Sequence, residues 1–140
     1  MNFRTFFEDY DQHKSASIIV TDNSNNILIL YRSSWLEWAP NKWGLPGGSV
    51  EEEEDYQDAA ERECYEETQI KPFNVKFFKS YDLDETKLYV YTGECGDQKP
   101  KLNNEHRDYE WISINEIDDY EFAPNVKQIL LNYFARSNII

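Results

Sequence analysis

The most informative stretch of the sequence runs from Gly47 to Ile70, GGSVEEEEDYQDAAERECYEETQI. Its second half, residues 56–68, consists of good helix formers and predicts a helix. Three carboxylates in this helix, Glu63, Glu66 and Glu67, are spaced i, i+3 and i+4, so they share one face about one turn apart. Their mutual repulsion destabilises a bare helix by about a few tenths of a kcal/mol per pair.

A divalent cation is the simplest physical explanation for this cluster of carboxylates. Mg²⁺ and Mn²⁺ prefer carboxylate, carbonyl and water oxygens, and a bound ion would remove the repulsion between the glutamates. The alternative is an ordinary acidic helix face in contact with solvent. We therefore expect a metal site on this helix, with Mg²⁺ as the ion and Mn²⁺ as the alternative.

The rest of the sequence predicts a mixture of strands and helices without strict alternation. Strands are expected over residues 15–21, 27–32, 75–81, 87–92 and 109–112, and an amphipathic helix is expected over residues 125–136. The first two strands flank the turn-forming sequence DNSNN, which predicts a β-hairpin. The fold class expected from this order is α/β or α+β with a mixed β-sheet.

Length and charge restrict the functions that the chain can have. Its 140 residues, of which 40% are hydrophobic, suit a single globular domain over residues 1–140. Fourteen basic and 27 acidic residues give a formal net charge of −13, which repels nucleic-acid backbones and anionic membranes. We therefore expect neither a nucleic acid nor a membrane as a partner. A polyphosphate would also be repelled unless divalent cations lay between it and the protein.

The expected cellular compartment follows from two features that the sequence lacks, a membrane-spanning run and the layout of a signal peptide. No apolar run approaches the roughly 20 residues that span a bilayer, and Met1–Tyr10 lacks the layout of a signal peptide. Without export, Cys64 and Cys95 are expected to be reduced thiols. The expected location is the cytoplasm.

The stretch also resembles the Nudix box, the signature of hydrolases acting on nucleoside diphosphates linked to another moiety. That pattern is Gly, five residues, Glu, seven residues, then Arg-Glu-apolar-any-Glu-Glu-any-Gly-apolar. The positions in register are Gly48, Glu54, Arg62, Glu63, Glu66, Glu67 and Ile70. The resemblance implies a Nudix-type α/β/α sandwich, with a mixed sheet between helices.

Two positions depart from the pattern. Cys64 replaces an aliphatic residue, which a buried cysteine can imitate. Gln69 replaces the glycine that ends the helix with a positive φ. Either Gln69 adopts this left-handed conformation at a cost of roughly 1 kcal/mol, or the helix ends differently.

The resemblance also implies roles for the residues of the box. Glu63, Glu66, Glu67 and the carbonyl of Gly47 would bind the metal, which would bridge substrate phosphates and activate a water molecule. Glu63 and Glu66 are the catalytic candidates within the box. The structural candidates of the box are Gly48, Glu54 and Arg62. Arg62 would tether the preceding loop to the helix, with direct phosphate contact as the alternative.

A second stretch, Glu105-His106 followed by Trp111, resembles a segment found after the box in several Nudix hydrolases. There the glutamate reaches the metal cluster from a loop, so Glu105 is a catalytic candidate, as a further ligand or as the general base. For His106 a structural role is expected, with proton donation to a phosphate as the alternative.

Substrate-binding candidates precede the box. Arg32, at the end of a strand, is a candidate for contact with a phosphate, against an ordinary surface ion pair. Trp35 and Trp38 are candidates for stacking on a base. For Trp43, core packing and stacking remain open.

The expected function is metal-dependent hydrolysis of a phosphoanhydride bond in a nucleotide. The substrate would be a dinucleoside polyphosphate, a nucleoside triphosphate, ADP-ribose or a nucleotide sugar. One alternative is a sensor that binds a nucleotide without cutting it, although such proteins usually lack the box glutamates. A diphosphate isomerase with this fold would need further catalytic residues. A homodimer is common in this fold, but no residue pattern here requires one.

Overall fold

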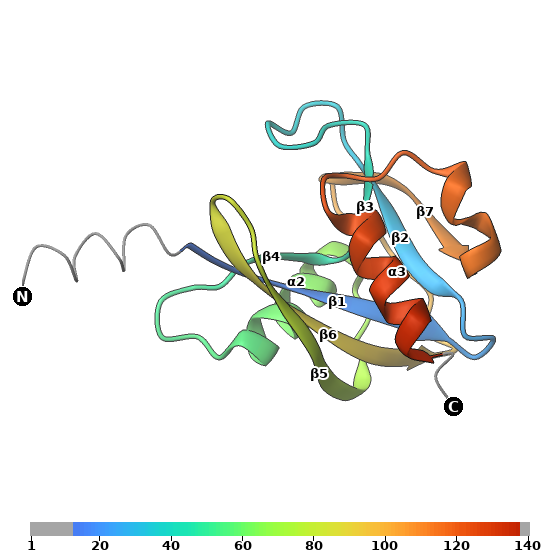
Figure 1. The fold of residues 1–140 in the computed structure, drawn as a ribbon, viewed down its shortest axis with the longest axis horizontal. Helices are drawn as coiled ribbons and strands as arrows, with labels where there is room; N and C mark the ends of the chain where they lie inside the picture. Colours follow the sequence, from blue (N-terminus) through green and yellow to red (C-terminus); the bar gives the residue numbers. More distant parts are fainter. Residues whose placement is uncertain (1–12, 138–140) are drawn as a thin grey trace, which may run out of the picture.

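The computed structural model describes residues 13–137, which form a mixed β-sheet between two helices (Figure 1). The strands are β1 (His13–Asp22), β2 (Ile27–Arg32), β3 (Trp43–Gly44), β4 (Gly47–Ser49), β5 (Phe73–Asp82), β6 (Thr86–Gly96) and β7 (His106–Ile112). The helices are α2 (Tyr56–Thr68), the short 3-10 helix η1 (Ile114–Asp119) and α3 (Val126–Ser137). The expected fold class is confirmed. The expectation about a signal peptide concerned Met1–Tyr10, which lies outside the described residues.

The predicted hairpin forms only at its turn. The Asp22 carboxylate accepts the N–H groups of Ser24 and Asn26, each at 2.9 Å, and Thr21 pairs with Ile27. Beyond this point the two strands separate. β1 pairs in parallel with β6 and in antiparallel with β4, whereas β2 pairs with β3 and β7. The separation allows β4, which begins the glycine-rich stretch, to lie against β1.

The sheet is buried on both faces, which explains why β1 is apolar without alternation. Ile18 and Val20 belong to the core beneath α2, together with the buried thiol of Cys64. Ile19 belongs to the opposite core, together with Ile129 of α3. Both cysteines are buried free thiols, as expected, and burial raises the pKa of Cys64 to about 12.

Helix α2 has the bounds that the sequence predicts, because both of its ends are capped. The Asp55 carboxylate accepts the N–H groups of Gln57 and Asp58 at the first turn. At the other end, Gln69 adopts the left-handed conformation with φ 59°, and its N–H donates to the carbonyl of Tyr65. Of the two alternatives at this position, the structure therefore shows the left-handed one.

Replacing Gln69 by glycine is expected to stabilise the protein by about 0.5–1 kcal/mol, because glycine adopts a positive φ without a Cβ clash. Chemical denaturation measures the change. The matched control is Glu61→Gly in the interior of the same helix, which should destabilise by about 1 kcal/mol. If both variants were less stable than the wild type, the prediction that Gln69 is strained would be wrong.

Candidate active site

The two glycines of β4 allow unusually close approach at the start of the site. A Cβ atom at Gly47 would lie 2.5 Å from the Cβ of Ser17 and 2.6 Å from the carbonyl oxygen of Ala16. A Cβ atom at Gly48 would lie 2.5 Å from the carboxylate carbon of Glu63. Glycine at these positions thus brings β4 against β1 on one side and against α2 on the other.

Arg62 joins the loop before α2 to the acidic face of the helix. Its guanidinium binds both carboxylate oxygens of Glu54, at 2.8 and 3.1 Å, and the carbonyl of Ser49 at 3.1 Å. The same group reaches Glu63 at 2.8 Å and Glu66 at 3.1 Å. Its hydrogen bonds lower the pKa of Glu54, and its carboxylate partners raise its own pKa. Arg62 therefore holds the loop before α2 against the helix.

Glu67 is a buried carboxylate with few compensating charges. Its side chain belongs to a residue that is only 3% exposed, and one oxygen accepts the N–H of Gly47 at 3.0 Å. Burial raises its pKa well above the ordinary value, and the negative charges of Glu63 and Glu105 add to this rise. Burial also raises the pKa of Glu63, although Arg62 opposes the shift. The site therefore has an excess of negative charge.

Glu105 reaches this cluster from the loop between β6 and β7. The loop is attached to the end of α2, where the N–H of Asn103 donates to the Glu67 carbonyl at 3.2 Å. On its other side, the carbonyl of Glu105 accepts the N–H of Ser33 at 2.9 Å. The structure thus brings Glu105 together with Glu63 and Glu67, whose pKa values its charge raises. Nothing in the sequence around Ser33 or Asn103 indicates these contacts.

The residues present fit a divalent cation by the chemistry of their oxygen ligands and by their charge. The Glu67 carboxylate is nearly inaccessible and lies beside two others, and a cation would offset the excess of negative charge that the nearby arginines leave. Between residues 13 and 137, however, no three acidic, histidine or cysteine side chains already converge closely enough to enclose an ion. Glu63 and Glu66 are instead turned toward Arg62. Metal binding therefore requires side-chain rearrangement about Arg62.

Replacing Glu67 by glutamine is expected to stabilise the metal-free protein at neutral pH by about 1–3 kcal/mol, because glutamine avoids the cost of burying an ionisable group whose folded pKa is raised. Because folding raises the pKa of Glu67 above its ordinary value of 4.5, its contribution to stability is complete below that value. The contribution is lost as the pH rises through the folded pKa. The advantage of the variant should therefore disappear near pH 4. Urea unfolding with chelator at several pH values checks this, and an advantage that is constant with pH would contradict it.

The three substrate-binding candidates lie close together at the β2–β3 loop. The guanidinium of Arg32 donates to the carbonyls of Trp38 and Ala39 and stacks over the Trp38 ring, 4.9 Å from its centroid. The Trp35 indole N–H donates to the carbonyl of Asn104 at 3.2 Å. Trp35 and Trp38 are 62% and 56% exposed. Both rings are therefore accessible to a ligand.

Of the other two aromatic candidates, Trp43 is partly buried against the core and His106 is buried. Trp43 lies against Tyr31 and Tyr120, with ring centroids 5.0 and 5.2 Å apart. His106 is only 5% exposed, and its Nδ1 atom has no hydrogen-bond partner among the described residues. Burial and the charge of Arg32 lower the pKa of His106 to about 4. A neutral, buried imidazole is poorly suited to donate a proton at pH 7.

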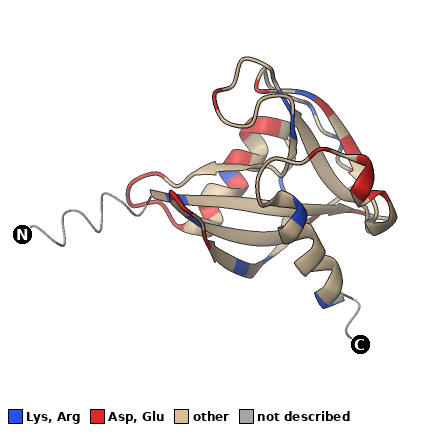
Figure 2. Cartoon of the chain, turned by 45° about the horizontal axis from the view of Figure 1, so that its top comes forward, with Lys and Arg blue, Asp and Glu red and all other residues tan. Residues whose placement is uncertain are grey.

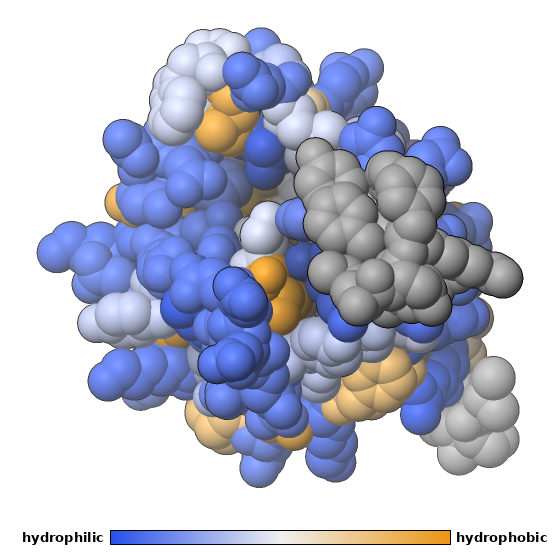
Figure 3. Space-filling model, turned by 90° about the vertical axis from the view of Figure 1, so that its left-hand side faces the viewer, coloured by the Kyte–Doolittle hydropathy of each residue, from blue (hydrophilic) through white to orange (hydrophobic). Residues whose placement is uncertain are grey.

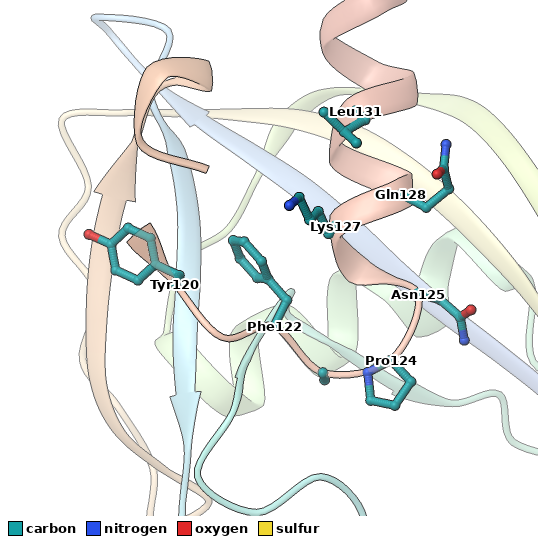
Figure 4. Close-up of a pocket in the computed structure, with 8 residues that line it drawn as sticks. Tyr120, Phe122, Pro124, Asn125, Lys127, Gln128 and Leu131 are labelled. Atoms are coloured by element: carbon teal, nitrogen blue, oxygen red, sulfur yellow. The ribbon is translucent and has the colours of Figure 1, made fainter. Parts of the chain in front are cut away.

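The surface outside the cluster gives little indication of a second site. Acidic residues are frequent on α2 and on the loop before it (Figure 2), and hydrophilic side chains predominate on the face shown in Figure 3. A cavity of about 590 Å³ lies beside the start of α3, between Tyr120, Phe122, Asn125 and Leu131 (Figure 4). None of its lining residues belongs to the carboxylate cluster. Among the helices described, none is long and apolar enough to cross a bilayer.

Comparison with known proteins identifies relatives over most of the chain. A phosphonate hydrolase from Streptomyces rubellomurinus, named CMP-5'-(N-acetyl-N-hydroxy-3-aminopropyl)phosphonate hydrolase, is 30% identical over 110 residues, which cover 73% of this chain and 52% of that protein. A prenyl-diphosphate phosphatase from Methanosarcina mazei is 28% identical over 80% of this chain and 70% of that protein. The chain thus spans about half the length of the first relative.

Solved structures share the fold. The crystal structure of a MutT protein from Methanosarcina mazei Go1 matches with a TM-score of 0.73 and 28% identity, covering 92% of this chain and 96% of that one. The NUDIX domain of Shewanella oneidensis NrtR, complexed with ADP-ribose, matches with a TM-score of 0.78 but only 18% identity, covering 99% and 100%. The latter likeness shows the fold alone.

A model of the NUDIX domain matches residues 11–133. Because this match spans most of the chain and includes the whole stretch from Gly47 to Ile70, the chain belongs to the Nudix hydrolase family.

Proposed function

We propose that this chain hydrolyses a phosphoanhydride bond in a nucleoside diphosphate linked to another moiety, and that it needs Mg²⁺ or Mn²⁺. The observation that carries the proposal is the buried carboxylate of Glu67, 3% exposed and bound to the N–H of Gly47, beside Glu63 and Glu105. A chain gains no stability from such a group. A polyphosphate and its counter-cations would complete the site electrostatically.

The metal would be held by Glu63, Glu66, Glu67 and the carbonyl of Gly47. When bound, it supplies neutralisation of the phosphate charge and a lower pKa for a water molecule. Arg62 keeps the loop before α2 against the helix through Glu54, which maintains the position of the glycines of β4. Glu105 would accept the proton of the attacking water as its oxygen bonds to phosphorus and the bridging P–O bond breaks.

The substrate proposed first is a nucleoside triphosphate or a dinucleoside polyphosphate, with ADP-ribose and nucleotide sugars next. Two relatives are named a prenyl-diphosphate phosphatase and an RNA pyrophosphohydrolase, so these two classes of substrate are included in the test. A formal charge of −13 argues against a long RNA, which needs a basic surface. We also propose that the protein acts in the cytoplasm. A homodimer remains an open proposal, because no surface of residues 13–137 requires one.

The test is a hydrolysis panel of these compounds, including geranyl diphosphate and a triphosphorylated RNA, with Mg²⁺, with Mn²⁺ and with chelator. We expect turnover of at least one nucleotide that requires the metal. Tight nucleotide binding without hydrolysis of any compound would instead establish a sensor. Turnover of geranyl diphosphate alone would place the substrate outside the nucleotides.

A further inference from the structure

Arg32 is engaged in contacts within its own loop. Its Nε atom donates to the carbonyls of Trp38 and Ala39 at 3.1 and 3.2 Å, and its Nη2 atom donates to the same Trp38 carbonyl at 2.8 Å. Its backbone N–H and C=O bind Lys42 and Asn41, at 2.9 and 3.1 Å, which closes the loop. A phosphate would have to compete with these carbonyls for the guanidinium.

The loop needs such support, because its backbone is strained. Ala39 and Asn41 have φ values of 48° and 58°, a region that non-glycine residues occupy at a cost of about 1 kcal/mol each. The Arg32 guanidinium binds two carbonyls of the loop and lies 4.9 Å from the centroid of the Trp38 ring. These contacts compensate the strain. The conformation of Trp38 therefore depends on Arg32.

The same loop is joined to the segment that carries Glu105. The Ser33 hydroxyl and the Trp35 indole N–H both donate to the carbonyl of Asn104, at 3.0 and 3.2 Å. The negative charges of Glu67 and Glu105 act on the Arg32 guanidinium, although burial lowers the pKa of Arg32 overall. The loop that carries Trp38 therefore lies next to the segment that carries Glu105.

Trp38 offers a flat face at this position. One side of the ring meets the guanidinium, while the residue remains 56% exposed, so the opposite side is open to solvent. Aromatic rings stack on bases whatever the base, because every base has a π-face. A cation beneath the ring holds it in place and leaves the outer face free.

We propose that Arg32 is a positioning residue that holds Trp38 as a stacking platform for the base of the substrate, beside the carboxylate cluster. The proposal rests on the proposed function and restricts its substrate to compounds with an aromatic base. It replaces the expectation that Arg32 contacts a phosphate. Trp35 supports the loop instead, because its indole N–H donates to the carbonyl of Asn104.

The experiment compares nucleoside monophosphates with ribose 5-phosphate, which differ only in the base. Equilibrium binding of AMP, GMP, CMP and UMP is measured by calorimetry for the wild type, Arg32→Ala, Trp38→Leu and the double variant. We expect at least one monophosphate to bind the wild type about tenfold tighter than ribose 5-phosphate. Each single variant should lose this preference, and the double variant should lose no more than either single one.

Arg32→Lys distinguishes positioning from phosphate contact. Lysine keeps the charge but lacks the planar fork that spans two carbonyls, so it should behave like alanine. Rescue by lysine, or an equal loss for ribose 5-phosphate and the monophosphates, would overturn the proposal. So would a wild type without preference for any base. Circular dichroism verifies that each variant is folded.

The matched control is a second cation–aromatic pair on the protein, Tyr65 with Lys71, whose ammonium lies 5.5 Å from the ring centroid. Tyr65→Leu should change the binding of no ligand in the series. Because binding is measured without turnover, the two proposals fail separately. A preference for a base, with no compound of the panel hydrolysed, would contradict the enzymatic function. Hydrolysis of a nucleotide without any preference for a base would contradict the role of Trp38 as a stacking platform.

Discussion

Glu67→Gln is expected to lower kcat/KM by about 10²-fold or more for whichever nucleotide the protein hydrolyses. The substitution removes the most buried negative charge of the cluster while leaving an oxygen that can accept the N–H of Gly47. The fold should therefore persist, and the loss of about 2.7 kcal/mol or more would reflect a lost metal ligand. Steady-state kinetics over a range of Mg²⁺ concentrations separates weaker metal binding from slower chemistry.

Glu61→Gln is the matched control for this substitution. It makes the same change of charge on the same helix, but Glu61 pairs with Gln57 rather than with the cluster. Its kcat/KM should stay within about twofold of the wild type, as is usual for a surface substitution. Comparable losses in both variants would show that general charge on α2 matters, and not Glu67. A Glu67→Gln variant with nearly full activity would contradict the proposed metal site.

Gly47→Ala is expected to destabilise the protein by about 3 kcal/mol or more. The added methyl would lie 2.5 Å from the Cβ of Ser17 and 2.6 Å from the carbonyl oxygen of Ala16. Rotation of a side chain cannot relieve contacts with these atoms, so β4 would have to move away from β1. The pairing of the two strands and the hydrogen bond from Gly47 to Glu67 would then be weakened together. Urea denaturation measures the loss.

Gly48→Ala is the informative comparison, because the three atoms nearest its methyl all lie at the end of a side chain. The contact atoms belong to the carboxylate of Glu63, which can rotate away. We expect a stability loss below about 1 kcal/mol, together with impaired activity from the displaced carboxylate. If Gly48→Ala were the more destabilising of the two, the packing of β4 described above would be wrong.

Local sequence patterns were sufficient for α2, α3 and the longer strands, but they predicted neither β4 nor the 3-10 helix η1. Helix α2 begins and ends where the sequence predicts, because its capping residue Asp55 and its helix formers act within a few positions. The carboxylates Glu63, Glu66 and Glu67 lie on one face for the same reason, since helical periodicity is a local property. The resemblance to the Nudix box then identified the family that the comparisons confirm.

Pairing between distant strands could not be read from the sequence. The hairpin prediction assumed that neighbouring strands stay together, whereas β1 and β2 share only the pair Thr21 and Ile27. β1 instead pairs along its whole length with β6, more than 70 residues away. The apolar runs of these strands suit several partners equally well, so burial of both sheet faces decides among them.

The family, the mixed fold and the set of carboxylates follow from the sequence, because each depends on spacing along one segment. How these groups contact one another depends on the tertiary structure. It placed the Glu105 loop against the end of α2, turned Glu63 and Glu66 toward Arg62, and committed the guanidinium of Arg32 to the carbonyls of its own loop. These contacts join residues separated by loops, whose paths depend on hydrogen bonds and packing that no local pattern encodes.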